Sequence, residues 1–110
     1  MNYQHKELAS GRWYKLTFIE QMANIGSEIE RTINWKNKNN PDYSGLAFDR
    51  ALELLDLTIS DKNNVSRLKE LVRVRETLAD YFAFNNIYKS NDDLWKKYFS
   101  IFNYAARIKS

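Results

Sequence analysis

Apolar positions in this chain recur every three or four residues in four successive stretches, the spacing that places side chains on one face of an α-helix. Polar, turn-forming residues separate these stretches at positions 37–45, 60–64 and 85–91. No stretch alternates apolar and polar residues as a half-buried strand would. We therefore predict an all-α protein that folds as an antiparallel up-and-down four-helix bundle.

The first predicted helix has a clear start. Thr17 and Glu20 form the capping-box pattern, in which each side chain bonds a backbone N–H at the helix start. We expect this helix to end near residues 35–38. Gly26 in its middle costs about 1 kcal/mol relative to alanine, so we expect a neighbouring helix to approach closely there. The apolar stripe of this helix comprises Phe18, Met22, Ile25, Ile29 and Ile33.

The other three helices are predicted from the same periodicity. We expect the second to begin at Pro41 or Ser44, the third to span Val65 to Phe84, and the fourth to begin at Ser90 or Asn91. Asp92 and Asp93 then lie in the first turn of the fourth helix, where negative charge suits the helix dipole. We predict that the inner face of the fourth helix comprises Leu94, Tyr98, Ile101, Phe102, Ala105 and Ile108, extended by Trp95, Phe99 and Ala106.

One charged residue interrupts the apolar stripe of the third helix. Arg75 lies between Leu71 and Leu78 on the helical wheel, and a buried guanidinium without a partner would be very costly. Either the guanidinium meets a carboxylate in the core, or the stripe is partly open to solvent there. We favour a buried ion pair, with Asp56 and Glu28 as candidate partners of Arg75. We interpret the pair as a structural one that fixes helix register rather than as a catalytic site.

Length and composition indicate one domain spanning residues 1–110, with residues 1–12 as a tail or a short extra helix. The 110 residues are 44% hydrophobic and 15% aromatic, enough to build one core. There is no cysteine, which excludes disulfides and suits a reducing compartment. The N-terminus lacks the apolar core of a signal peptide, and no apolar run is long enough to span a membrane. We expect a cytoplasmic protein with no membrane association.

The residues that catalysis or metal binding require are scarce. His5 is the only histidine, so neither a Ser–His–Asp triad nor a Glu-x-x-His di-iron motif can be built. No glycine-rich phosphate loop is present. Asp49, Glu53 and Asp56 share one helix face, a row that is usually solvated but leaves a carboxylate-only site open. We predict no catalytic, cofactor or metal site and a protein that is not an enzyme.

Nucleic-acid binding is the alternative function that the sequence suggests. Basic and aromatic residues interleave at residues 12–15, 35–38 and 95–98, where rings could stack on bases while lysines meet phosphates. The net charge is only +3, and acidic residues neutralise the outer line of the third helix. The candidate contacts are Lys36, Lys38, Lys96, Asn103 and Arg107.

Self-association is the function we favour. The fourth helix is apolar over a wider arc than one bundle core requires, because Trp95, Phe99 and Tyr104 add to its predicted inner face. Such a surplus either covers the aromatic segment at residues 12–14 or forms an interface. We predict a non-enzymatic helical interaction module that forms a homo-oligomer or binds a protein partner.

The stretches FIEQMANIGSEIERTINWK, FDRALELLDLT and YFSIFNYAAR resemble a family of small uncharacterised prokaryotic proteins, over residues 13–107. That resemblance implies no activity and no catalytic residues. In architecture the chain is also similar to the ribosomal S23-like four-helix proteins and to accessory proteins of diversity-generating retroelements. This similarity implies a ring-like assembly that binds nucleic acid. The Asn- and Lys-rich composition suggests a prokaryote with an AT-rich genome.

Overall fold

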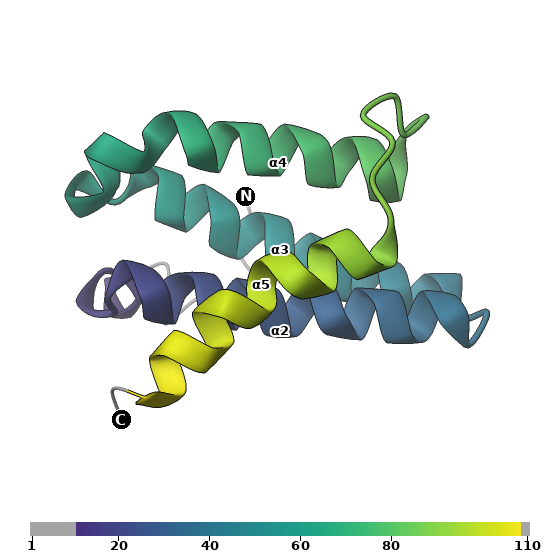
Figure 1. Ribbon diagram of the computed structural model, residues 1–110, viewed down its shortest axis with the longest axis horizontal. Coiled ribbons are helices and arrows are strands. Elements are labelled where there is room, and N and C mark those ends of the chain that lie inside the picture. The colour runs from purple at the N-terminus through teal and green to yellow at the C-terminus, as the bar shows by residue number, and fades with distance from the viewer. Residues whose placement is uncertain (1–10, 109–110) are drawn as a thin grey trace.

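The computed structural model describes residues 11–108, and all regular structure in that range is helical (Figure 1). The elements are the 3₁₀ helix η1 (Arg12–Lys15), α2 (Phe18–Asn37), α3 (Pro41–Ser60), the 3₁₀ helix η2 (Lys62–Arg67), α4 (Leu68–Ala83) and α5 (Asp92–Ile108). The predicted all-α four-helix bundle is confirmed. Most of the predicted N-terminal tail, including His5, lies outside the described residues.

The helix starts follow the local sequence. At the start of α2, Glu20 N donates to Thr17 Oγ1 at 3.1 Å and Thr17 N donates to Glu20 Oε1 at 2.8 Å, which is the predicted capping box. Helix α3 begins at Pro41, and the Asn40 side chain accepts a hydrogen bond from Tyr43 N. Pro suits this position because the missing N–H has no intrahelical partner there.

The third predicted helix begins later than expected. Residues 62–67 form η2 instead, so the α-helix starts at Leu68 rather than Val65. The Asp61 side chain caps η2 by accepting a hydrogen bond from Asn63 N, and Asn64 N bonds back to Asp61 O. These short-range bonds favour the tighter 3₁₀ winding over an α-helical turn.

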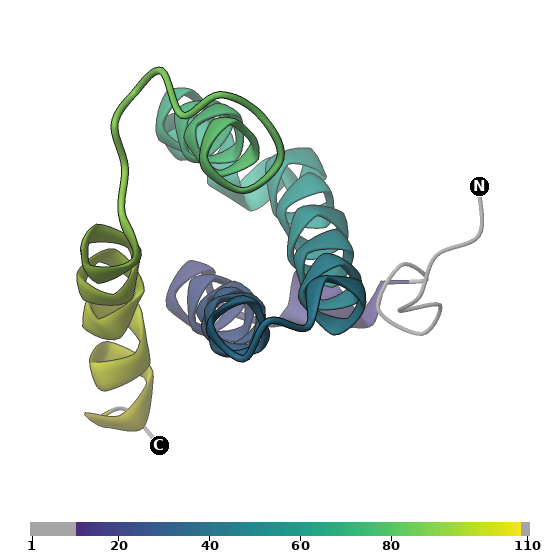
Figure 2. The same cartoon turned by 90° about the vertical axis from the view of Figure 1, so that its right-hand side faces the viewer.

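Consecutive helices run in opposite directions, and α2 lies at the centre of the arrangement (Figure 1). Helix α3 packs on one side of α2 and α5 packs on the other, crossing α2 obliquely. Helix α4 packs mainly on α3 and makes little contact with α5, so the two outer helices stand apart when seen end-on (Figure 2). Helices α4 and α5 are therefore joined through side chains of the shared core rather than by close packing of one helix on the other.

A single hydrophobic core joins the four helices and η1. Trp13 of η1 is only 1% exposed, and its indole Nε1 donates to Thr58 Oγ1 at 2.9 Å. Tyr14 is hydrogen-bonded through its hydroxyl to Ser60 at 2.7 Å. The aromatic residues at positions 12–15 thus anchor η1 to α3, and the prediction that they stack on nucleic acid is wrong for Trp13.

A buried polar network that the sequence analysis did not predict lies beside this anchor. Gln21 is fully buried, and its Nε2 donates to Asp61 Oδ2 at 2.9 Å and to Trp13 O at 3.1 Å. Asn64 Nδ2 donates to Gln21 Oε1 at 2.9 Å and to Thr58 O at 3.0 Å. The network joins η1, α2, α3 and η2, and its partners offset the cost of burying polar groups.

Candidate interaction surface

Helix α5 presents one apolar face to the core and a second one to solvent. Trp95 and Phe99 are buried against α2, whereas Leu94, Ile101 and Ile108 are 54%, 67% and 63% exposed. The predicted inner face of α5 is therefore wrong for these three aliphatic residues. Helix α5 is turned by about one residue position, roughly 100°, so that its aromatic side chains rather than its aliphatic ones meet α2.

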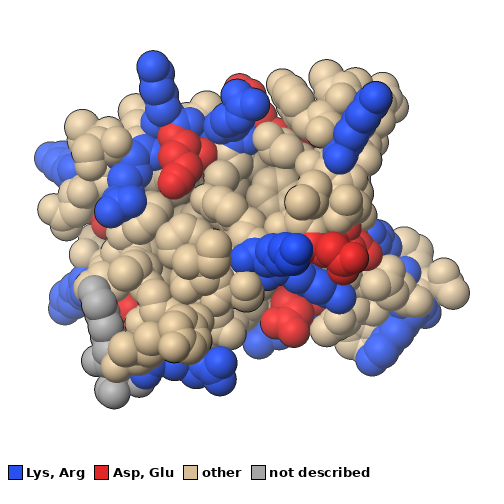
Figure 3. Space-filling model, viewed as in Figure 1, with Lys and Arg blue, Asp and Glu red and all other residues tan. Residues whose placement is uncertain are grey.

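The exposed and partly exposed apolar residues of α5 are regularly spaced. The α5 stripe, as we name it, consists of Leu94, Tyr98, Ile101, Ala105 and Ile108, which follow one another at steps of four, three, four and three residues. This is the spacing of the contact positions in a coiled coil. Figure 3 shows uncharged surface beside α5 and toward α4, next to charged side chains that lie over the first half of α5.

Tyr98 stands at the inner edge of the α5 stripe. Its hydroxyl oxygen is buried and has no hydrogen-bond partner among the described residues. Burial, and secondly the negative charge of Glu70 on α4, raise the pKa of Tyr98 to about 12. The hydroxyl therefore stays protonated at neutral pH and is suited to contact rather than to proton transfer.

Three polar side chains meet where the ends of α2, α4 and α5 converge. Lys36 Nζ and Tyr81 Oη each donate to Asp92 Oδ1 at 2.6 Å, and Lys36 Nζ lies 3.0 Å from Tyr81 Oη. Lys36 also stacks over the Tyr81 ring, with its Nζ 4.7 Å from the ring centroid. The charge of Lys36, a predicted phosphate contact, is paired with Asp92 in the structure, so the contact stays a prediction with a competing partner.

The protonation states of this cluster are the unreactive ones. Burial alone would lower the pKa of Lys36, but the hydrogen bonds to Asp92 and Tyr81 raise it above its usual value. Burial and the hydrogen bond to Asp92 raise the pKa of Tyr81. Burial acts to raise the pKa of Asp92, and the bonds from Lys36 and Tyr81 outweigh it and lower that pKa. Each of the three pKa values is shifted further from neutral pH. The cluster therefore joins the helix ends and offers no group that could act as a general acid or base at neutral pH.

The remaining predicted nucleic-acid contacts are divided between two places. Lys38 lies over the Trp35 ring, with Nζ 5.2 Å from the ring centroid. Lys96 and Asn103 both line a hollow of about 260 Å³ between α2 and α5, whose wall also includes the acidic Glu30. Arg107 follows on the same side of α5, in its last turn. These residues do not form one basic patch with Lys36.

The predicted arginine pair forms at the surface instead of in the core. Arg75 Nε donates to Asp56 Oδ1 at 2.7 Å, and the two side chains are 39% and 50% exposed. The outer edge of the α4 stripe is open to water at this point. Glu28 is not a partner of Arg75, because it pairs with Arg31 at 2.6 Å. The predicted pairing of Arg75 with Asp56 is therefore confirmed, whereas the prediction that this pair is buried is wrong.

Within residues 11–108, no three His, Cys, Asp or Glu side chains come close enough to hold a metal ion. No helix in the described part of the chain is long and apolar enough to cross a membrane. Comparisons with protein-family models, with curated proteins and with solved structures gave no match to this chain.

Proposed function

We propose that this protein is a non-enzymatic helical module that pairs with a second copy of itself through the α5 stripe. One observation carries the proposal: α5 has two apolar faces, and residues 11–108 cover only one of them. The side chains of Leu94, Ile101, Tyr104 and Ile108 are each more than half exposed. Apolar surface gathered on one helix in this way is characteristic of an interaction site.

The α5 stripe fits a second copy because three of its exposed residues are evenly spaced about Ile101. Leu94 and Ile108 each lie seven residues from Ile101. In a two-fold antiparallel pair, Ile101 lies near the axis and Leu94 of each copy meets Ile108 of the other. Antiparallel helices also oppose their dipoles. The acidic first turn with Asp93 then lies near the partner's last turn, which carries Arg107.

Sedimentation equilibrium tests the pairing. The wild-type protein should sediment as a dimer at tens of micromolar, and Ile101→Lys should weaken the dimer at least about tenfold because it buries a charge at the two-fold axis. Val65→Lys is the matched control, since Val65 is 71% exposed but lies on η2, away from α5. A wild-type protein that stays monomeric at roughly 1 mM, or an Ile101→Lys variant that dimerises normally, would overturn the proposal.

Nucleic-acid binding is the competing proposal, and the side of α5 that carries Lys96, Asn103 and Arg107 supports it. A titration of single-stranded DNA across salt concentrations tests it, because phosphate contacts give a steep loss of affinity with salt. Binding that is weakened by Lys96→Ala would favour nucleic-acid binding. This substitution leaves the α5 stripe unchanged. We also propose a cytoplasmic location and a prokaryotic origin, and both rest on the sequence.

A further inference from the structure

The connection between α4 and α5 displays apolar side chains to solvent. Phe84, Ile87 and Tyr88 are 74%, 71% and 51% exposed. We call residues 84–91 the α4–α5 loop. Single exposed apolar residues are common on protein surfaces, but three within five positions of one loop form a patch.

A buried carboxylate of α4 holds the backbone of the α4–α5 loop through hydrogen bonds. Asp80 is only 8% exposed, and its two carboxylate oxygens accept hydrogen bonds from Ile87 N at 2.9 Å and Tyr88 N at 3.0 Å. Asn86 N donates to the backbone oxygen of Asp80 at 3.0 Å. Both apolar residues at the tip of the loop are thus held through their own backbone by the last turns of α4.

A second set of bonds closes the loop across its base. The Asn86 side chain accepts from Ser90 N at 2.8 Å and donates to Ser90 O at 3.0 Å. Asn86 has a φ of 54°, in the left-handed region that asparagine tolerates better than most residues. The loop therefore presents Ile87 and Tyr88 from an ordered backbone, and an ordered loop loses little entropy when it binds.

We propose that the α4–α5 loop of each copy packs on the C-terminal end of the partner's α5, against Tyr104 and Ile108. This inference rests on the antiparallel pairing proposed above. The loop leads directly into the first turn of α5, and antiparallel pairing places that turn beside the partner's last turn. Figure 2 shows the loop running from the end of α4 across to the start of α5.

The area of the interface supports the same arrangement. The four exposed side chains of α5 offer on the order of 400–500 Å² of apolar surface, whereas a standard interface buries about 800 Å² per partner. The three loop side chains add roughly 300 Å², which brings the total to that standard size. The exposed side chains of α5 alone form an interface smaller than the standard size, and together with the loop they approach that size.

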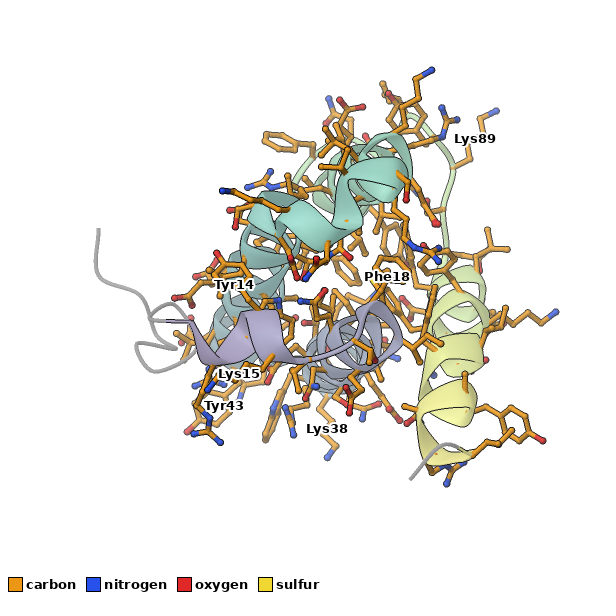
Figure 4. The ribbon with its side chains drawn as sticks, turned by 90° about the vertical axis from the view of Figure 1, so that its left-hand side faces the viewer. Tyr14, Lys15, Phe18, Lys38, Tyr43 and Lys89 are labelled. Atoms are coloured by element: carbon orange, nitrogen blue, oxygen red, sulfur yellow. The ribbon has the colours of Figure 1, made fainter. Side chains whose placement is uncertain are left out.

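The charge of the loop fits the end of a helix. Lys89 is the only charged residue among positions 84–91, and it projects away from the helices (Figure 4). A cation is stabilised near the C-terminal end of a helix, where unpaired carbonyl oxygens gather. In the proposed dimer, Lys89 lies near that end of the partner's α5, while Arg107 lies on the polar side of the helix.

Cysteine cross-linking tests this contact cleanly, because the chain has no cysteine of its own. A mixture of Tyr88→Cys and Tyr104→Cys chains, oxidised by copper–phenanthroline and oxygen, should give a covalent dimer that neither variant gives alone. Ile101→Cys should cross-link to itself at the two-fold axis and so reports the pairing independently. Asp42→Cys, at an exposed site in the first turn of α3, replaces Tyr88→Cys in the control mixture and should give no such product.

Affinity provides the second measurement. The double variant Ile87→Ser/Tyr88→Ser should weaken the dimer about tenfold or more, and Leu46→Ser, at a 45% exposed site on α3, should not. A failed Tyr88–Tyr104 cross-link in protein that still cross-links through Ile101→Cys overturns the loop contact and leaves the α5 pairing intact. An unchanged Kd of the Ile87→Ser/Tyr88→Ser variant likewise overturns the loop contact and leaves the α5 pairing intact. If wild-type protein is monomeric and Ile101→Cys forms no dimer, the pairing itself is wrong.

Discussion

Phe99 occupies the space that a side chain on Gly26 would need. A Cβ placed on Gly26 would lie 2.8 Å from Phe99 Cβ and 3.1 Å from Phe99 Cγ. The close approach that the sequence predicted at this glycine is confirmed, and the approaching helix is α5. The contact also explains the rotation of α5, because Phe99 can reach α2 only when the aliphatic side chains turn outward.

Gly26→Ala should lower the free energy of unfolding by about 1–2 kcal/mol. The added methyl group meets the base of the Phe99 side chain, so α5 has to move, and overpacking of this kind costs about 1–3 kcal/mol. The better helix propensity of alanine returns up to about 1 kcal/mol. Urea unfolding followed by circular dichroism at a single protein concentration measures the difference.

Gly45→Ala is the matched control for that experiment. Gly45 also lies in a helix, but nothing is within 4 Å of a Cβ placed there. We expect this substitution to raise the free energy of unfolding by about 0.5–1 kcal/mol through helix propensity alone. Equal effects at the two glycines would mean that α5 does not press against α2 at Gly26.

The buried amide of Gln21 gives a second prediction. In Gln21→Leu the apolar side chain fills much of the space, but Asp61 loses a donor and Asn64 loses an acceptor. Buried groups left without partners cost about 1–3 kcal/mol each, so we expect a loss of about 2–4 kcal/mol in thermal or urea unfolding. Asn24→Ala, on the exposed side of the same helix, should change the stability by no more than about 0.5 kcal/mol.

The sequence predicted the features that local chemistry determines. Periodicity revealed the four helices, and the pair Thr17 and Glu20 marked the start of α2 because a capping box involves only neighbouring residues. Periodicity could not reveal that Gln21 meets Asp61 and Asn64, since Gln21 lies 40 and 43 residues from them and the three show no periodic pattern. Polar side chains that satisfy one another inside a fold look like ordinary loop residues in the sequence.

The orientation of α5 could not be read from the sequence for a different reason. Leu94 and Trp95 begin two adjacent apolar faces of one helix, and either face could pack on the core. The long-range contact between Gly26 and Phe99 decides between them. The exposure of the Arg75–Asp56 pair could not be read from the sequence for a related reason. A position in an apolar stripe does not show whether the stripe is open to water at that edge.

The surface ion pair between Arg75 and Asp56 should contribute little to stability. Exposed pairs are typically worth about 0.2–1 kcal/mol, and salt screens them. A double-mutant cycle with Arg75→Ala and Asp56→Ala, measured by urea unfolding, should give a coupling energy in that range that falls in 1 M salt. A coupling above about 3 kcal/mol would show that the pair is buried in solution.

Asp92 should matter more than its neighbour Asp93. Asp92→Ala removes the acceptor shared by Lys36 and Tyr81 and frees the first turn of α5 from α2 and α4. We expect it to lower the free energy of unfolding by about 1–2 kcal/mol at neutral pH. Asp93→Ala removes the same charge from the same turn, so it controls for the helix dipole and should cost no more than about 0.5–1 kcal/mol.

The effect of Asp92 should depend on pH in a defined direction. Its pKa in the folded protein is lowered below the usual value of about 3.9, so the bonds stabilise the fold fully above that value and are lost as the pH falls through the folded pKa. The pKa of Lys36 is raised above about 10.4, so its contribution is complete below that value and is lost as the pH rises through the folded pKa. The stability gap between the Asp92→Ala and Asp93→Ala variants should therefore be flat from about pH 5 to 9 and should close in acid below about pH 4. A gap that persists at pH 2 would mean that Asp92 acts through something other than its charge.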